Sequence, residues 1–196
     1  MAWLVAGLGN PGPEYERSPH NLGFLAVDRF AERNGIRLTR PECKAWVGLG
    51  KVGDTQVVVA KPQTFMNLSG VSVKALLEKY ALPLESLLLV YDELALPFGQ
   101  LRIRPKGSAA GHNGVSSVIQ SVGSEEFRRL RIGCCSPGHK GGKEYLLSPM
   151  RREHLKELDS ILDLTAQAIE TITAKGAEQA MAIYNRRAQS EPETNG

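Results

Sequence analysis

The sequence predicts a single-domain α/β fold, a three-layer αβα sandwich around a mixed, mostly parallel, twisted sheet. Short apolar runs bounded by Gly and Pro alternate along the chain with longer segments whose apolar residues recur at helical spacing. The chain has 196 residues, of which 42% are hydrophobic, and this is enough for one well-buried core. We find no internal repeat and no linker that would divide the chain.

The first half of the chain is expected to contain three strands and two helices. Residues 3–8 form a short apolar run broken by Gly and Pro, which is typical of a buried strand. Ser18 is a suitable N-cap for a helix with Pro19 at its first position, and Gly35 would end this helix. The elements expected to follow are strands at residues 46–52 and 56–60 and a helix at residues 71–80.

The second half begins with an apolar strand at residues 87–91, with Asp92 at its carboxyl end. Residues 100–104 alternate polar and apolar side chains, as an exposed or edge strand would. Ser148-Pro149 is expected to cap a long amphipathic helix that ends at Gly176. The remaining elements are a helix after His112, a strand at residues 129–134 and a short helix through Tyr184. Residues 1–188 should form the domain, followed by a polar, disordered tail at 189–196.

The composition indicates an ordinary soluble globule. Charged residues make up 23% of the chain, and the net charge of +3 permits an anionic partner without requiring one. Cys43, Cys134 and Cys135 are odd in number and lack metal-ligand spacing, which favours a reducing cytoplasm. The short apolar run at the amino terminus has no basic leader, so we expect neither a secretory signal nor a membrane partner.

Gly7, Gly9 and Gly12 match the Gly-x-Gly-x-x-Gly spacing of dinucleotide sites. Such a site needs backbone N–H groups at a helix start that face a pyrophosphate. Pro11 and Pro13 remove two of these donors and disturb the helix entry. We therefore interpret the glycines as part of a structural turn and expect no cofactor.

A set of polar residues next to apolar runs offers the most complete chemistry in the chain. His20 is a titratable base, and Asp92 could hold its other ring nitrogen and stabilise the charged form as it develops. The positive end of the predicted helix would instead favour the neutral ring, and either outcome leaves a usable base near neutral pH. Amides that suit carbonyl binding stand at Asn10, Asn67 and Asn113. The alternative is structural: turns and caps for the amides, and a packed histidine.

Two adjacent carboxylates follow the apolar strand at residues 87–91. Ligands gather at the carboxyl ends of strands in open α/β sheets, so we expect Asp92 to be the functional one. Glu93 is interpreted as a solvated loop residue.

Covalent and metal-dependent mechanisms are disfavoured. The serines lack the Gly-x-Ser-x-Gly setting of a nucleophile elbow, and Cys134-Cys135 lies in an apolar strand where packing is the simpler role. The four histidines show no zinc-like spacing with one another or with the cysteines. We therefore expect no metal ligand in this chain.

Basic residues gather in two places. Arg102 and Arg104 share one face of a predicted strand with Lys106 just beyond, and Arg128, Arg129 and Arg131 follow later. These residues could form a solvated surface, or their planar guanidinium groups could bind phosphate. The chain contains no base-reading module, so a nucleic acid would be held by its backbone and shape.

Several motifs together resemble the bacterial-type peptidyl-tRNA hydrolase family. They are Gly-Leu-Gly-Asn-Pro-Gly with Tyr15 and His20-Asn21, Lys-Pro-Gln-Thr-Phe-Met-Asn-Leu-Ser-Gly, Asp-Glu-Leu-Ala-Leu-Pro-Phe-Gly from Asp92, Lys-Gly-Ser-Ala-Ala-Gly-His-Asn-Gly and Phe-Arg-Arg-Leu-Arg-Ile-Gly. The resemblance covers roughly residues 4–184. It implies a monomeric α/β globule that hydrolyses the ester joining a peptide to the 3′ end of tRNA.

The resemblance also implies roles for individual residues. His20 would be the catalytic base and Asp92 its partner. The implied substrate contacts are Asn10, Asn67 and Asn113 on the peptide and the attacking water, Tyr15, Met66 and His112 along the cleft, and Arg104 and Arg131 on the 5′-phosphate of tRNA.

Two departures from the family pattern are visible, and two other functions stay open. Ala110 stands where the family often has Gly, which would stiffen the loop carrying His112 and Asn113. Cys134-Cys135 replaces a usual Ile-Gly. The other functions are a non-catalytic RNA-binding relative and a dinucleotide-binding oxidoreductase.

Overall fold

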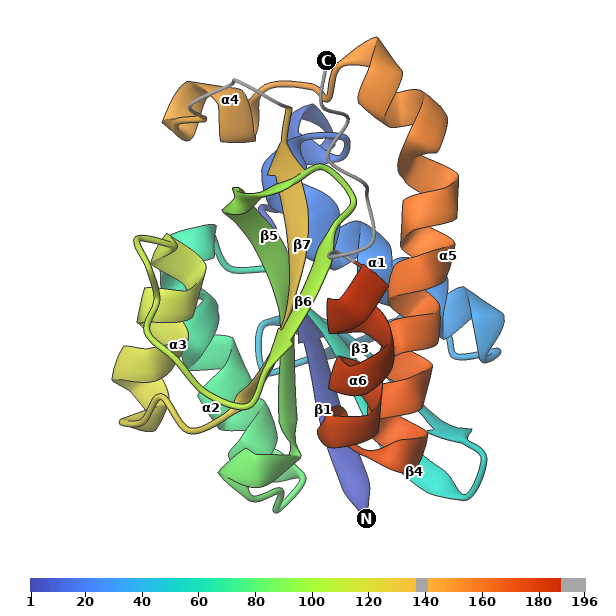
Figure 1. The fold of residues 1–196 in the computed structure, drawn as a ribbon. Helices are drawn as coiled ribbons and strands as arrows, with labels where there is room; N and C mark the ends of the chain where they lie inside the picture. The colour runs from blue at the N-terminus through green and yellow to red at the C-terminus, as the bar shows by residue number, and fades with distance from the viewer. Residues whose placement is uncertain (137–140, 188–196) are drawn as a thin grey trace.

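A seven-stranded mixed sheet with helices on both faces forms the protein, as predicted (Figure 1). The computed structural model describes residues 1–136 and 141–187, so the predicted tail at 189–196 lies outside the described residues. The strand order is β2-β3-β4-β1-β5-β7-β6. The strands are β1 (Ala2–Gly7), β2 (Arg40–Glu42), β3 (Ala45–Val52), β4 (Thr55–Pro62), β5 (Leu87–Pro97), β6 (Leu101–Arg104) and β7 (Arg128–Cys135).

The centre of the sheet is parallel and its edges are antiparallel. Strands β4, β1, β5 and β7 are neighbours and run the same way, whereas β3 and β6 run against them. The central strands are buried on both faces, which explains why their sequences are nearly continuous apolar runs. Strand β6 lies at one edge, as its alternating pattern predicted. Strand β2, at the other edge, was not predicted because its three residues carry no apolar pattern.

The helices divide into two layers (Figure 1). Helices α1, α5 and α6 cover one face of the sheet, and α2 and α3 cover the other, each over its own hydrophobic cluster. Within the described residues, none of the helices is both long and apolar enough to cross a membrane. The helices are α1 (Leu22–Arg33), α2 (Ser69–Lys79), α3 (Asn113–Val122), α4 (Lys143–Leu147), α5 (Arg152–Lys175) and α6 (Ala177–Arg187), with short 3-10 helices η1 (Pro13–Tyr15), η2 (Pro19–Asn21), η3 (Met66–Leu68) and η4 (Leu84–Ser86).

Two predicted helix caps were wrong in detail. The Ser18 hydroxyl donates to the Tyr15 carbonyl oxygen instead of accepting from the following turn. The long helix α5 has its N-cap at Arg151, because residues 148–149 instead follow the short helix α4. In both places a short helical element precedes the amphipathic helix, and the apolar periodicity of the long helix carries no signal for it.

The glycines after β1 allow close packing. A Cβ atom on Gly7 would lie 2.3 Å from the Gly23 carbonyl oxygen, and one on Gly23 would lie 2.4 Å from the Val90 carbonyl oxygen. Helix α1 therefore approaches β1 and β5 more closely than any side chain would permit. The chain after Gly12 enters the three-residue helix η1, which is too short to present a helix N-terminus to a pyrophosphate.

Candidate active site

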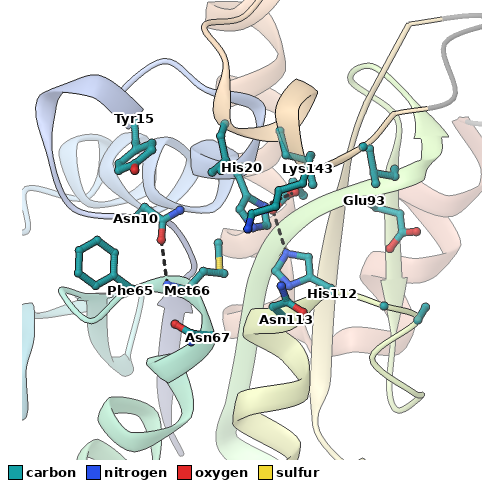
Figure 2. A pocket seen from close by; sticks show the side chains of 17 residues that line it. Asn10, Tyr15, His20, Phe65, Met66, Asn67, Glu93, His112, Asn113 and Lys143 are labelled. Atoms are coloured by element: carbon teal, nitrogen blue, oxygen red, sulfur yellow. Dashed lines mark hydrogen bonds and ion pairs between the residues drawn. The ribbon is translucent and has the colours of Figure 1, made fainter.

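A cavity of about 610 Å³ opens at the carboxyl ends of the parallel strands. The strand carboxyl ends lie toward the top of Figure 1, where α4 also lies. Eight of the ten predicted site residues line this cavity, and Figure 2 shows most of them converging on it. These eight residues are Asn10, Tyr15, His20, Met66, Asn67, Asp92, His112 and Asn113.

His20 and Asp92 form the centre of the cavity. The His20 Nδ1 atom lies 2.8 Å from Asp92 Oδ2, and both side chains are buried. Because a carboxylate can only accept, Nδ1 carries the hydrogen and the lone pair of the neutral ring is on Nε2. The ring comes from the 3-10 helix η2, not from the first turn of an α-helix as predicted.

Asp92 lies inside β5, not at its end. The predicted strand stopped at residue 91, but β5 continues to Pro97, five residues beyond Asp92. Its neighbour β1 stops pairing at Gly7, opposite Val90, so the following residues of β5 extend past β1 into the cavity. The sequence pattern placed the end of the strand where its apolar run stopped, which was wrong.

His112 also donates to Asp92. Its Nε2 atom lies 2.9 Å from Asp92 Oδ1, while its Nδ1 atom accepts hydrogen bonds from the backbone N–H groups of Gly114 and Val115 at the start of α3. These two backbone donors fix the tautomer, since Nδ1 must keep its lone pair. The His20 and His112 ring centroids are 5.0 Å apart. The two histidines therefore hold both oxygens of one buried carboxylate.

Asp92 is held in its ionised form. Burial alone would raise the pKa of this carboxyl group, but His112 and His20 outweigh burial and hold the pKa well below its usual range. The Tyr91 ring packs edge-on against His112, and burial raises the pKa of its phenol. Asp92 thus places a fixed negative charge at the centre of the cavity, and that charge already has two N–H donors.

Hydrogen bonds fix the orientation of the Asn10 amide. Asn10 Oδ1 accepts from the Met66 backbone N–H at 2.8 Å, so its Nδ2 donors face the other way (Figure 2). The side chain of Asn21 makes two hydrogen bonds to the Asn10 backbone: Asn21 Oδ1 accepts from the Asn10 N–H, and Asn21 Nδ2 donates to the Asn10 carbonyl oxygen. No local sequence pattern indicates this role of Asn21, although it directly follows His20. The remaining amides, Asn67 and Asn113, are exposed at the cavity rim.

Arg104 and Arg131 do not line the cavity. Arg104 lies on β6, and Arg131 lies on β7, where it contacts Glu93 of the cavity wall. Arg131 lies opposite Arg102 in the register of β7 and β6. With Arg104, two residues further along β6, they form an arginine patch (Arg102, Arg104, Arg131). Burial, followed by repulsion from Arg102 and Arg131, lowers the pKa of Arg104. Repulsion within the patch would be relieved by an anion.

Two other expectations about charged residues were wrong or incomplete. Glu93 is a buried residue of β5, 3.5 Å from Arg131, and not a solvated loop residue. Arg129 is buried and donates to the carbonyl oxygens of Ser108 and Glu125, so it contributes to the fold and not to a surface. Neither interaction has a signal in the local sequence, because the partners lie on other elements.

Part of the cavity wall comes from residues that were not predicted from the sequence. Helix α4 contributes Lys143, Leu146 and Leu147, and η3 is preceded by the exposed ring of Phe65. Helix α4 was not predicted because it is only five residues long.

In the described residues, His20, Asp92 and His112 form a group with the geometry of metal ligands, although their facing atoms hydrogen-bond to one another. Spacing along the sequence could not show this cluster, and His139 lies outside the described residues.

Ala110 adopts the left-handed backbone conformation that favours glycine. Its φ angle is +47°, and it precedes Gly111 in the loop that carries His112. We expect Ala110→Gly to raise the free energy of unfolding by roughly 0.5–1 kcal/mol, since the strain of an L-residue there exceeds the entropic cost of glycine. Urea unfolding measures this change. The neighbouring Ala109→Gly, at a residue without positive φ, should be destabilising, and equal signs for the two variants would contradict the strain argument.

Comparison with known proteins identifies the family of this fold and site. A family model described as peptidyl-tRNA hydrolase matches residues 4–193. The peptidyl-tRNA hydrolase of Solibacter usitatus is 55% identical over 188 residues, which is 95% of each chain. A chloroplastic peptidyl-tRNA hydrolase of Arabidopsis thaliana is 42% identical over 97% of this chain and 67% of its own length.

Solved structures give the same result. A single-residue variant of peptidyl-tRNA hydrolase from Acinetobacter baumannii superposes with a TM-score of 0.87, at 32% identity over 94% of each chain. The unsubstituted enzyme from the same organism gives a TM-score of 0.84 at 32% identity, over 92% of this chain and 93% of its own. These similarities favour the hydrolase over the RNA-binding and oxidoreductase alternatives. The chain belongs to the peptidyl-tRNA hydrolase family and has peptidyl-tRNA hydrolase activity.

Proposed function

We propose that His20 is the general base of peptidyl-tRNA hydrolysis and that Asp92 orients it. The observation that carries this proposal is the 2.8 Å contact between His20 Nδ1 and Asp92, which leaves the Nε2 lone pair to accept a proton. A water molecule gives a proton to Nε2 and its oxygen attacks the ester carbonyl. The tetrahedral intermediate then expels the 3′ oxygen of the ribose, which takes the proton back from Nε2.

Asn10 Nδ2 is the donor best prepared to stabilise the oxyanion. Its partner Met66 N–H occupies the carbonyl side of the amide, and Asn21 holds the Asn10 backbone, so the donor is oriented before the substrate binds. We assign Asn67 and Asn113 to peptide carbonyls or the attacking water, and Tyr15, Met66 and His112 to the walls. His112 also acts as a second anchor of Asp92.

The same arrangement accounts for a preference for blocked amino groups. A free α-ammonium group in the cavity would lose water and need an anionic partner. Asp92 is the buried carboxylate at the centre, and its oxygens already accept from His20 and His112. An acylated nitrogen carries no charge, so it does not meet this penalty.

The arginine patch is proposed to hold the 5′-phosphate of tRNA, through Arg104 and Arg131. Guanidinium groups match phosphate geometry, and Arg131 keeps donors beyond its contact with Glu93. We further propose that the protein works as a monomer in a reducing compartment such as the cytoplasm, where its three cysteine thiols stay reduced. Light scattering of the purified protein tests the monomer.

One assay tests the assigned chemistry. N-acetyl-aminoacyl-tRNA and free aminoacyl-tRNA with the same amino acid are incubated with the protein, with and without a chelator. We expect the blocked substrate to be cleaved at least about tenfold faster than the free one. The chelator should leave the rate for the blocked substrate unchanged. Equal cleavage of both substrates would contradict the proposed preference for blocked amino groups, and loss of activity with the chelator would assign the cluster of His20, Asp92 and His112 to a metal.

A further inference from the structure

We propose that a second cavity beside Asn10 is a subsite for the upstream residues of the peptide, those on the amino-terminal side of the residue esterified to tRNA. This proposal rests on the site roles proposed above. The second cavity has a volume of about 490 Å³ and shares Asn10 with the active-site cavity. Its walls come from the loop after β1, from α1 and from strands β3 and β4.

The order of the strands separates this cavity from the arginine patch. His20 and Asp92 lie over β1 and β5 at the centre of the sheet, and the patch lies on β7 and β6 to one side. Trp46 and Lys61, which line the second cavity, lie on β3 and β4 to the other side. For a substrate whose ester is at His20 and whose tRNA reaches the patch, this order places the second cavity on the side away from the tRNA.

The arginine patch and the second cavity adjoin opposite ends of the active-site cavity. Glu93 lines the active-site cavity and contacts Arg131, which marks the end nearer the tRNA. Asn10 marks the other end, and Tyr15 and Phe65 lie on that side in Figure 2, away from His112 and Glu93. A chain leaving the ester past Asn10 would pass these two aromatic rings before it reaches the second cavity.

The charge of the second cavity suits a peptide better than a nucleic acid. Its two cationic side chains, Arg17 and Lys61, are matched by the carboxylates of Glu16 and Asp28. Lys61 Nζ lies 2.8 Å from Asp28 Oδ2, so its charge is already paired. A phosphate backbone would meet no net positive charge here, unlike at the arginine patch.

Aromatic surface gives this cavity its binding capacity. The indole of Trp46 is 41% exposed, although a ring of this size is usually more buried. Lys61 Nζ lies 5.1 Å from the centroid of the Phe24 ring, and the ion pair with Asp28 keeps the ammonium group in this position. Trp46 and the aliphatic stem of Lys61 thus offer an apolar surface above the buried Phe24 ring, which would bind apolar upstream side chains and tolerate many sequences.

The test compares substrates of two lengths on wild-type protein and the variant Trp46→Ala. The short substrate is N-acetyl-alanyl-tRNA, and the long substrates place three phenylalanines or three glycines between the acetyl group and the same alanine. We expect Trp46→Ala to raise KM about five- to tenfold for the phenylalanine substrate, with little change for the glycine and short substrates. Leu49→Ala, at an equally exposed residue of the same strand outside the cavity, is the matched control and should change none of them.

Each other outcome would overturn the subsite. Equal KM for wild type and variant on the phenylalanine substrate would show that Trp46 does not contact the peptide. A similar rise for all three substrates, with weaker inhibition by deacylated tRNA, would make the second cavity a tRNA site. Cleavage of the short substrate by His20→Ala, compared with wild type, tests the catalytic role separately, so failure of the subsite and failure of the proposed catalytic roles are distinguishable.

Discussion

Replacing His20 with alanine should reduce kcat about 10²–10⁴-fold and leave the affinity for tRNA nearly unchanged. This range is the usual contribution of a positioned general base. The variant removes the Nε2 lone pair that accepts the proton of water. The arginine patch that is proposed to hold the tRNA lies on β6 and β7, away from the helix η2 that carries His20. Single-turnover kinetics with N-acetyl-aminoacyl-tRNA measure the chemical step, and competition by deacylated tRNA measures the affinity.

Stability must be separated from chemistry in this experiment, because His20→Ala also removes one donor from the buried Asp92. His20→Gln offers an N–H group to that carboxylate but no base, so it should lose as much turnover with less loss of stability. His154→Ala is the control, since it removes a buried imidazole that bonds Ser136 and stacks on Phe98 outside the cavity. It should lower the unfolding temperature and preserve kcat. Unchanged turnover in the His20 variants would exclude His20 as the base.

Replacing Arg104 and Arg131 together with alanine should weaken tRNA binding roughly ten- to a hundredfold and flatten its salt dependence. Each phosphate contact adds about 0.7–0.9 to the slope of log K against log salt, so the slope should fall by about 1.4–1.8 if both side chains touch phosphate. Binding titrations between about 50 and 200 mM salt measure it. The chemical step should stay near wild type, since neither side chain lines the active-site cavity.

The control must remove the same charge elsewhere. Lys51 and Lys74 are exposed on β3 and α2, and replacing both with alanine also lowers the net charge by two. This variant should keep the wild-type slope within about 0.5, because exposed charges beyond a Debye length are screened. Equal slopes for wild type and the double arginine variant would remove Arg104 and Arg131 from the phosphate site.

Local sequence patterns were reliable where one element decides the outcome. The apolar runs that became β1 and β5, the alternation of β6 and the apolar stripe of α5 each reflect the burial of their own residues, so their periods were readable. The polar signals at His20 and Asn10 were also readable, because few polar side chains interrupt such runs. Strand β2 and helix α4 were missed because three and five residues cannot establish a period.

By itself, the sequence determined the α/β class, the order of most strands and helices, and the residues able to carry the chemistry. Only the tertiary structure decided how those residues are coupled. His20, Asp92 and His112 come from three segments of the chain, and their two hydrogen bonds depend on how far β5 extends past β1 and on where α3 begins. The pairing of Glu93 with Arg131 and the clamp of Asn21 on Asn10 are likewise contacts between distant segments. Such contacts are fixed by packing and strand register, which residue order along one element does not encode.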